Sequence, residues 1–236
     1  MITDILNPTS FRYERKFLIS ELDKYEIELI LKFHPAIFSE IYHQRFVNNI
    51  YFDTVNLSSY FDNAFGVSQR LKVRIRWYGD LFGFIEKPIL ELKIKSGFLG
   101  GKLRYPLDSF YFDNNYSLNA QQDIFAKSGL PDVLTEHLKS LRCTLLNRYS
   151  RKYFRSADHK FRATIDFDME FYKIDPENNS FIEKIVDHNN TVLELKYSGS
   201  DKDDEMARFI TNQFLFRMTK SSKYVSGIEK LDISSD

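Results

Sequence analysis

The sequence predicts an α+β fold, in which helices flank an antiparallel, barrel-like sheet. Segments typical of strands outnumber segments typical of helices, and most strands follow one another directly along the chain, as they do in antiparallel sheets. Within the strands, charged residues alternate with aliphatic or aromatic ones. Because successive side chains of a strand point to opposite faces, each strand has one charged and one apolar face.

The alternation is most regular where Arg70, Lys72, Arg74 and Arg76 occupy every second position. A single strand with one solvated face shows the same pattern, and this is its commonest explanation. Here, however, the tripeptide Glu-x-Lys repeats the alternation at 14–16, 91–93 and 194–196, and residues 162–170 also carry their charges at one parity. The collective pattern favours a closed sheet with a polar interior, whose charges must be paired or neutralised by a ligand.

The elements are expected in a definite order along the chain. The first helix has Ser20 as its predicted N-cap, with Asp23 three residues on, and ends before Pro35. Its predicted apolar residues are Leu22, Tyr25, Leu29, Ile30 and Phe33. Strands are expected at 11–19, 46–52, 69–78, 89–95, 102–107, 146–155, 162–171 and 192–197, and further helices at 119–142 (as a pair), 203–216 and 221–231.

Glycine and proline mark the predicted turns. Gly97, Gly100 and Gly101 are expected to form the turn between two neighbouring strands, and Gly129 and Pro131 separate the paired helices. A hairpin is expected around residues 175–179.

Composition limits the class of protein. The chain has 236 residues and is 43% hydrophobic, which suits a single domain spanning residues 1–236. Lys+Arg and Asp+Glu are both 33, and the resulting zero net charge argues against a nucleic-acid partner. The single cysteine excludes a disulfide framework and fits a reducing compartment. Because no apolar stretch suits a membrane span and no signal peptide is expected, a cytoplasmic location without direct membrane insertion is predicted.

The charged segments resemble a known family, the polyphosphate polymerase (VTC) domain of the triphosphate tunnel metalloenzyme superfamily. The matching segments, in the family's order, are Arg12–Lys16, Ile50–Asp53, Arg74–Gly79, Glu91–Lys93, Tyr149–Arg151, Arg162–Asp166, Leu193–Lys196 and Lys220–Tyr224. The segment 74–79, Arg-Ile-Arg-Trp-Tyr-Gly, is the most specific. The resemblance implies an eight-stranded antiparallel β-barrel tunnel with a basic interior, flanked by helices.

The resemblance also implies the residues of the site. Arginine suits phosphate because it offers two donors in a fork, and carboxylate oxygens suit a hard cation such as Mg²⁺ or Mn²⁺. Glu194 falls on the metal-binding position. The residues implied to act in catalysis are Lys16, Arg74, Arg76, Lys93, Arg151, Arg162 and Lys196. Those implied to bind substrate are Lys72, Lys102, Lys220, Ser222 and Lys223, with Arg104 as an alternative to Lys102.

The implied activity is transfer of the ATP γ-phosphate onto a growing inorganic polyphosphate chain. A metal-dependent triphosphatase and a non-catalytic module that binds polyphosphate or inositol polyphosphates stay open as alternatives. Arg12 stands where related tunnel enzymes carry a metal-binding glutamate, which favours the polymerase. Residues 62–66 lack an arginine found in yeast-type polymerases, for which Arg70 or Lys72 could substitute.

Two acidic residues and one partner are also left open by the sequence. Asp166 and Asp168 could join Glu194 at the metal or could balance interior arginines. The expected partners are ATP and polyphosphate, and a separately encoded membrane protein that carries product away is a further candidate.

Overall fold

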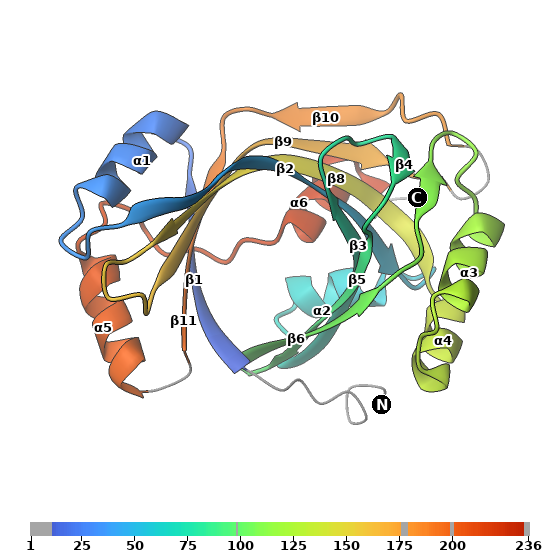
Figure 1. The fold of residues 1–236 in the computed structure, drawn as a ribbon, viewed down its shortest axis with the longest axis horizontal. Coiled ribbons are helices and arrows are strands. Elements are labelled where there is room, and N and C mark those ends of the chain that lie inside the picture. Colours follow the sequence, from blue (N-terminus) through green and yellow to red (C-terminus); the bar gives the residue numbers. More distant parts are fainter. Residues whose placement is uncertain (1–10, 98, 176–178, 199–200, 234–236) are drawn as a thin grey trace.

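The fold is a closed antiparallel barrel surrounded by helices (Figure 1). The computed structural model describes residues 11–97, 99–175, 179–198 and 201–233. The strands of the main sheet are β1 (Phe11–Ile19), β2 (Ser39–Asp53), β3 (Gln69–Tyr78), β5 (Ile89–Ser96), β6 (Leu99–Pro106), β8 (Arg142–Arg155), β9 (Arg162–Lys173), β10 (Lys184–Asp187) and β11 (Thr191–Ser198). This nine-stranded sheet has the order β10-β9-β11-β1-β6-β5-β3-β2-β8. Because β8 also pairs with β9, eight strands close into a ring and β10 stays outside it, which confirms the predicted barrel.

The junctions of the ring differ greatly in length. β2 and β8 pair along most of their length, and β3 pairs with β5 from Gln69 to Arg76. β1 pairs with β11 from Arg12 to Ile19. The junction between β1 and β6 is much shorter: within the described ranges, only Phe11 opposite Gly101 and Arg12 opposite Gly100 are paired.

The apolar faces of the strands turn outward and are covered by helices on two sides of the barrel (Figure 1). On one side, Val73, Ile75 and Leu92 pack with α3 (Leu118–Lys127) and α4 (Asp132–Lys139), the predicted helix pair. On the other side, Leu195 packs with α1 (Lys24–Lys32) and α5 (Asp201–Asn212). The charged faces of the same strands therefore turn inward.

The start and the buried face of α1 differ from the sequence prediction. Asp23, not Ser20, is the N-cap, and its side chain forms a capping box with Glu26. The buried residues are Ile27, Glu28 and Leu31, whereas Tyr25, Leu29 and Phe33 are 61%, 51% and 83% exposed. The stripe at 25, 29 and 33 has helical spacing too, but the sheet covers the opposite stripe.

A final helix, α6 (Lys223–Lys230), packs against the inner face of the barrel at one end. Tyr224 and Ile228 form a buried cluster with Leu145 and Tyr149 of β8. Figure 1 shows α6 within the outline of the ring. A glycine permits this close approach, because a Cβ on Gly227 would lie 2.4 Å from Cδ2 of Leu145.

Short elements and some boundaries also differ from the prediction. α2 (Ser58–Ala64), packed beside α6, has no side-chain cap to announce it, and β4 (Gly83–Ile85) and β7 (Phe110–Phe112) are too short to show a period of two. Gly100 and Gly101 lie in β6 and pair with β1, so only Gly97 belongs to the turn. α5 ends at Asn212 instead of residue 216. The predicted hairpin joins the paired strands β9 and β10, and its residues 176–178 lie outside the described part of the chain.

Candidate active site

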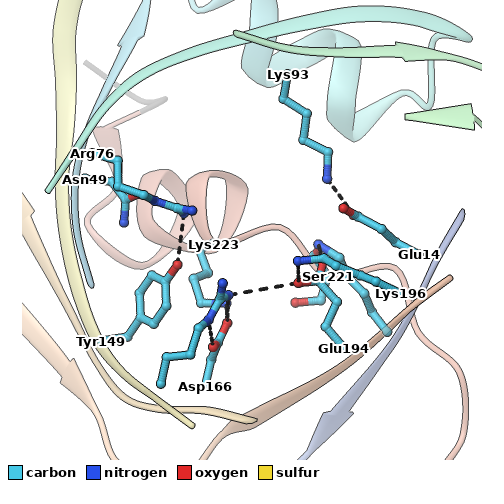
Figure 2. A network of polar contacts seen from close by, with 12 residues as sticks. Glu14, Asn49, Arg76, Lys93, Tyr149, Asp166, Glu194, Lys196, Ser221 and Lys223 are labelled. Carbon is cyan, nitrogen blue, oxygen red and sulfur yellow. Dashed lines mark hydrogen bonds and ion pairs between the residues drawn. The ribbon is translucent and has the colours of Figure 1, made fainter. Parts of the chain in front are cut away.

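Charged side chains from opposite walls of the barrel point toward a common interior space (Figure 2). In one cross-strand row, Glu91 lies between Arg74 and Arg104. Its Oε2 accepts hydrogen bonds from Nε and Nη2 of Arg74 at 2.9 and 2.5 Å, and its Oε1 accepts one from Nε of Arg104 at 3.0 Å. Burial alone would raise the pKa of Glu91, but Arg74, Arg76 and Lys102 hold that pKa well below its ordinary value. In this row, one carboxylate is therefore shared by the two arginines beside it.

The next row is made of lysines alone: Lys72, Lys93 and Lys102 are direct neighbours across β3, β5 and β6. Burial and nearby cations lower the pKa of Lys72 to about 6. Burial lowers the pKa of Lys93 to about 8, although Glu14 accepts a hydrogen bond from its Nζ at 2.6 Å. Burial also lowers the pKa of Lys102 well below its ordinary value. Like charges directly opposite on neighbouring strands repel, so this row attracts an anion.

Glu194 of β11 lies among basic side chains on the opposite wall of the barrel (Figure 2). Its carboxylate oxygens lie 3.3 Å from Nζ of Lys16, 2.8 Å from Nζ of Lys196 and 4.0 Å from Nη2 of Arg151. Burial would raise the pKa of Glu194, but Lys196 and Lys16 override it and hold the pKa well below its ordinary value. The carboxylate is therefore ionised at neutral pH.

The carboxylate of Asp166 is paired with interior cations. It accepts hydrogen bonds from Nε and Nη2 of Arg151 at 2.5 and 2.6 Å and from Nζ of Lys223 at 2.5 Å. Burial would raise its pKa, but Arg151 and Lys223 lower the pKa of Asp166 to about 2. Of the two roles left open by the sequence, the structure supports charge balance.

Asp168 faces away from Glu194, so the alternative that places it at the metal is wrong. A β-bulge is the cause, because Arg148 pairs with Glu170 whereas Ser150 pairs with Phe167, which leaves an extra residue on β9. Asp168 adopts a left-handed φ of 48° in this bulge. Its carboxylate pairs instead with Nζ of Lys24 at 3.4 Å and Nδ1 of His188 at 3.0 Å.

Hydrogen bonds fix two further predicted residues at the site. Nζ of Lys72 donates to Oγ of Ser222 at 2.7 Å, and Ser222 is also the N-cap of α6. Arg76 donates to Oδ1 of Asn49 at 2.9 Å and to the Tyr149 hydroxyl at 3.1 Å. These contacts hold the ends of the lysine row and of β3 against α6 and β8.

The predicted residues fall into two groups by position. Those that the structure brings together are Lys16, Lys72, Arg74, Arg76, Lys93, Lys102, Arg151, Glu194, Lys196, Ser222 and Lys223. Arg162 and Lys220 are exposed at its margins, although Arg162 lies in register with Lys196. Arg70 donates to the carbonyl of Asn63 at 3.4 Å, whereas Lys72 donates to Ser222. Lys72 is therefore the candidate substitute for the arginine that residues 62–66 lack.

Sequence reasoning did not assign Glu14, Glu91, Asn49 or Tyr149 to the site. The signal was available for Glu14 and Glu91, because each opens a Glu-x-Lys tripeptide whose lysine was assigned inward. Tyr149 lies two residues before Arg151, so it faces inward too. Asn49 is at the site because it pairs with Arg76, and the sequence does not show that register.

The donor set fits a divalent cation that is held partly by substrate. Among the described residues, no group of three or more His, Cys, Asp or Glu side chains gathers at one point. Mg²⁺ is commonly bound by one or two carboxylates together with substrate phosphates and waters. Glu194 meets the first need, and the surrounding lysines and arginines would place phosphate oxygens beside it.

The closed eight-stranded antiparallel barrel, with charged side chains pointing into it, defines a tunnel-like fold (Figure 2). The family model of the VTC domain matches residues 11–232, so the chain belongs to the VTC domain family. The PH1819 protein from Pyrococcus horikoshii has a similar structure, with a TM-score of 0.53 at 11% identity, over 93% of this chain and 99% of that one. A candidate adenylate cyclase from Vibrio parahaemolyticus is similar with a TM-score of 0.50 at 11% identity, over 95% and 98% of the two chains. No curated protein matches the sequence.

No helix in the described ranges has the length and apolar character that crossing a membrane requires. The cytoplasmic location, the single domain over residues 1–236 and the membrane-protein partner stay predictions.

Proposed function

We propose that this domain is an ATP-dependent polyphosphate polymerase that requires Mg²⁺ or Mn²⁺. The observation that carries the proposal is the row Lys72–Lys93–Lys102, which gathers three half-buried amines on neighbouring strands, each with a lowered pKa, without a matching row of carboxylates. A bound triphosphate or polyphosphate would supply the missing charge. Membership of the VTC domain family supports the polymerase in particular, because that family resemblance implies phosphate-chain synthesis.

In the proposed reaction, a terminal oxygen of the polyphosphate chain attacks the γ-phosphorus of ATP. The bond between this phosphorus and the β–γ bridging oxygen breaks, and ADP leaves with that oxygen. Phosphoryl transfer of this kind needs positioning and charge neutralisation more than a protein nucleophile. Arg74, Arg76 and Arg151 would hold phosphate oxygens, and Lys16, Lys93 and Lys196 would neutralise the charge that develops. A divalent cation at Glu194 would neutralise further charge on the phosphates.

The assigned binding residues extend beyond the enclosed centre. Lys72, Lys102, Ser222 and Lys223 would contact further phosphates at the α6 end, and Arg162 and Lys220 would contact the chain at the margins. Basic residues both inside the barrel and at its exposed margins support a polymer as substrate or product.

The test is incubation with ATP and either metal, followed by separation of the products. Long polyphosphate supports the polymerase, and free phosphate without polyphosphate supports the triphosphatase alternative. Nucleotide binding without turnover supports a sensor module. The double variant Arg74→Met/Arg76→Met is the control, since it removes two phosphate contacts but keeps an unbranched side chain at each position.

A further inference from the structure

An arginine held among three tyrosines lies at the margin of the tunnel and has no part in the site described above. The guanidinium carbon of Arg45 lies 4.7 Å from the ring centroid of Tyr42, 5.2 Å from that of Tyr153 and 5.6 Å from that of Tyr78. The rings of Tyr42 and Tyr153 meet edge to face at 5.7 Å. We call these four residues the aromatic rim.

The register of the strands places the aromatic rim on the inner face of the barrel. Arg45 of β2 pairs directly with Arg151 of β8, and Tyr42 pairs with Tyr153. Side chains directly opposite on neighbouring strands share a face. Tyr153 follows Arg151 by two residues and Tyr78 follows Arg76 by two, so all continue the inward rows past the phosphate-binding centre. The Arg151 guanidinium carbon lies 5.9 Å from the Tyr153 ring, which joins the aromatic rim to the tunnel.

The aromatic rim is open to solvent. Tyr42 is 55% exposed and Tyr78 is 47% exposed. Within the described residues, no hydrogen bond or ion pair is made by the Arg45 side chain, in contrast to Arg74 and Arg151, which are paired with carboxylates. Flat ring faces and free guanidinium donors are therefore both available at the same place.

We infer that the aromatic rim of Tyr42, Arg45, Tyr78 and Tyr153 binds the nucleobase of a nucleoside triphosphate whose phosphates enter the tunnel. Bases stack on aromatic rings and on arginine planes, and every base has a face to stack. Phosphate gains nothing from the negative face of a ring, so further phosphates do not explain the tyrosines. A nucleoside triphosphate carries its base at one end and its phosphates at the other, which matches an aromatic rim beside a cationic interior.

This inference rests on the proposed function, because it assumes that the tunnel holds the phosphates. It adds where the base of the nucleotide binds, and that contacts at Tyr42 and Tyr153 select a nucleotide over inorganic tripolyphosphate. Because stacking tolerates any base, the aromatic rim should accept purine and pyrimidine nucleotides with only modest preference.

The test compares ATP and inorganic tripolyphosphate by calorimetric titration without divalent metal, so that no turnover occurs. Tyr42→Ala and Tyr153→Ala should each weaken ATP binding about tenfold, the usual scale for one base–aromatic stack, and leave tripolyphosphate binding within about twofold. Tyr153→Phe keeps the ring and should bind ATP as the wild type does. Tyr111→Ala is the matched control, because Tyr111 is 69% exposed and its ring contacts that of Phe84 in the small β4–β7 sheet.

Equal losses for ATP and tripolyphosphate would overturn the inference, since the tyrosines would then support the phosphate site. Unchanged ATP binding in both alanine variants would overturn it too. If the wild type binds neither ligand, the proposed function itself fails. A second readout does not depend on affinity: the fluorescence of 2-aminopurine riboside triphosphate should be quenched by the wild type and not by the double variant Tyr42→Ala/Tyr153→Ala. Equal quenching by both proteins would count against the inference.

Discussion

Replacing Lys72 by Met should stabilise the empty protein, which is an unusual outcome for a polar residue that lines a site. Burial and the neighbours Lys16, Lys93, Arg70 and Arg74 lower the pKa of Lys72 from 10.5 to about 6. At pH 7 the unfolded chain therefore carries a proton on this amine and the folded chain does not. Methionine keeps an unbranched side chain in the same space and has no charge to desolvate.

The size of the effect follows from linkage. Keeping the Lys72 amine neutral costs about 1.4 kcal/mol for each pH unit below its ordinary pKa, or about 5 kcal/mol at pH 7. Allowing for the lost hydrogen bond to Ser222, Lys72→Met should raise the free energy of unfolding by about 2–4 kcal/mol at pH 7. Because the unfolded wild type binds the extra proton between the two pKa values, wild-type stability rises with pH across this window. The advantage of the variant should therefore shrink by about 1.4 kcal/mol per pH unit toward pH 10.

Urea unfolding between about pH 6.5 and about pH 9.5, in buffers free of phosphate, measures this difference. Lys16→Met is the matched control, because Glu194 and Glu14 outweigh burial and raise the pKa of Lys16 to about 12. A raised pKa stabilises the fold at every pH below the unfolded value, so Lys16→Met should destabilise the protein by a nearly constant amount in this range. The reasoning is refuted if Lys72→Met also destabilises the protein, or if its gain does not change with pH.

Three further predictions concern the site and its support. Glu194→Gln keeps the size of the side chain but loses the charge that a hard cation needs, so turnover should fall roughly 10²-fold while nucleotide binding persists; near-normal turnover at saturating metal would show a structural carboxylate. Tripolyphosphate should raise the melting temperature of the wild type, with about 2.7 kcal/mol of stabilisation at a hundredfold excess over its dissociation constant. It should not raise that of Arg74→Met/Arg76→Met. Scanning fluorimetry measures both, with monophosphate as the control ligand. Gly227→Ala should cost about 1–3 kcal/mol in urea unfolding, because its Cβ would lie 2.4 Å from Leu145 and force α6 off β8; unchanged stability would mean that α6 shifts freely.

The inward direction of the basic residues could be predicted because it depends only on alternation within one strand. β3 begins and ends at the predicted residues, and Arg74 and Arg76 face inward while Val73 and Ile75 pack under helices. Alternation repeats over several residues, so one irregularity does not hide it.

Features that depend on a partner strand or on a choice between two faces could not be predicted. The bulge at Asp168 reverses the alternation on β9, and only the pairing with β8 reveals it. The buried face of α1 could not be predicted, because Leu29 and Ile27 both lie on stripes with helical spacing. Packing against the sheet buries Ile27. The inward direction of Glu91 follows from its Glu-x-Lys tripeptide, but its contacts with Arg74 and Arg104 could not be predicted, since they come from three strands in register.

The short junction between β1 and β6 has a mechanical consequence. A closed ring opens first where the fewest backbone pairs hold it, and among the described residues only two pairs join these strands. The side-chain contact between Lys93 and Glu14, 2.6 Å long, links the two sides of this seam. A polyanion that draws Lys93 to itself would weaken that contact, so binding in the tunnel should loosen the junction between β1 and β6.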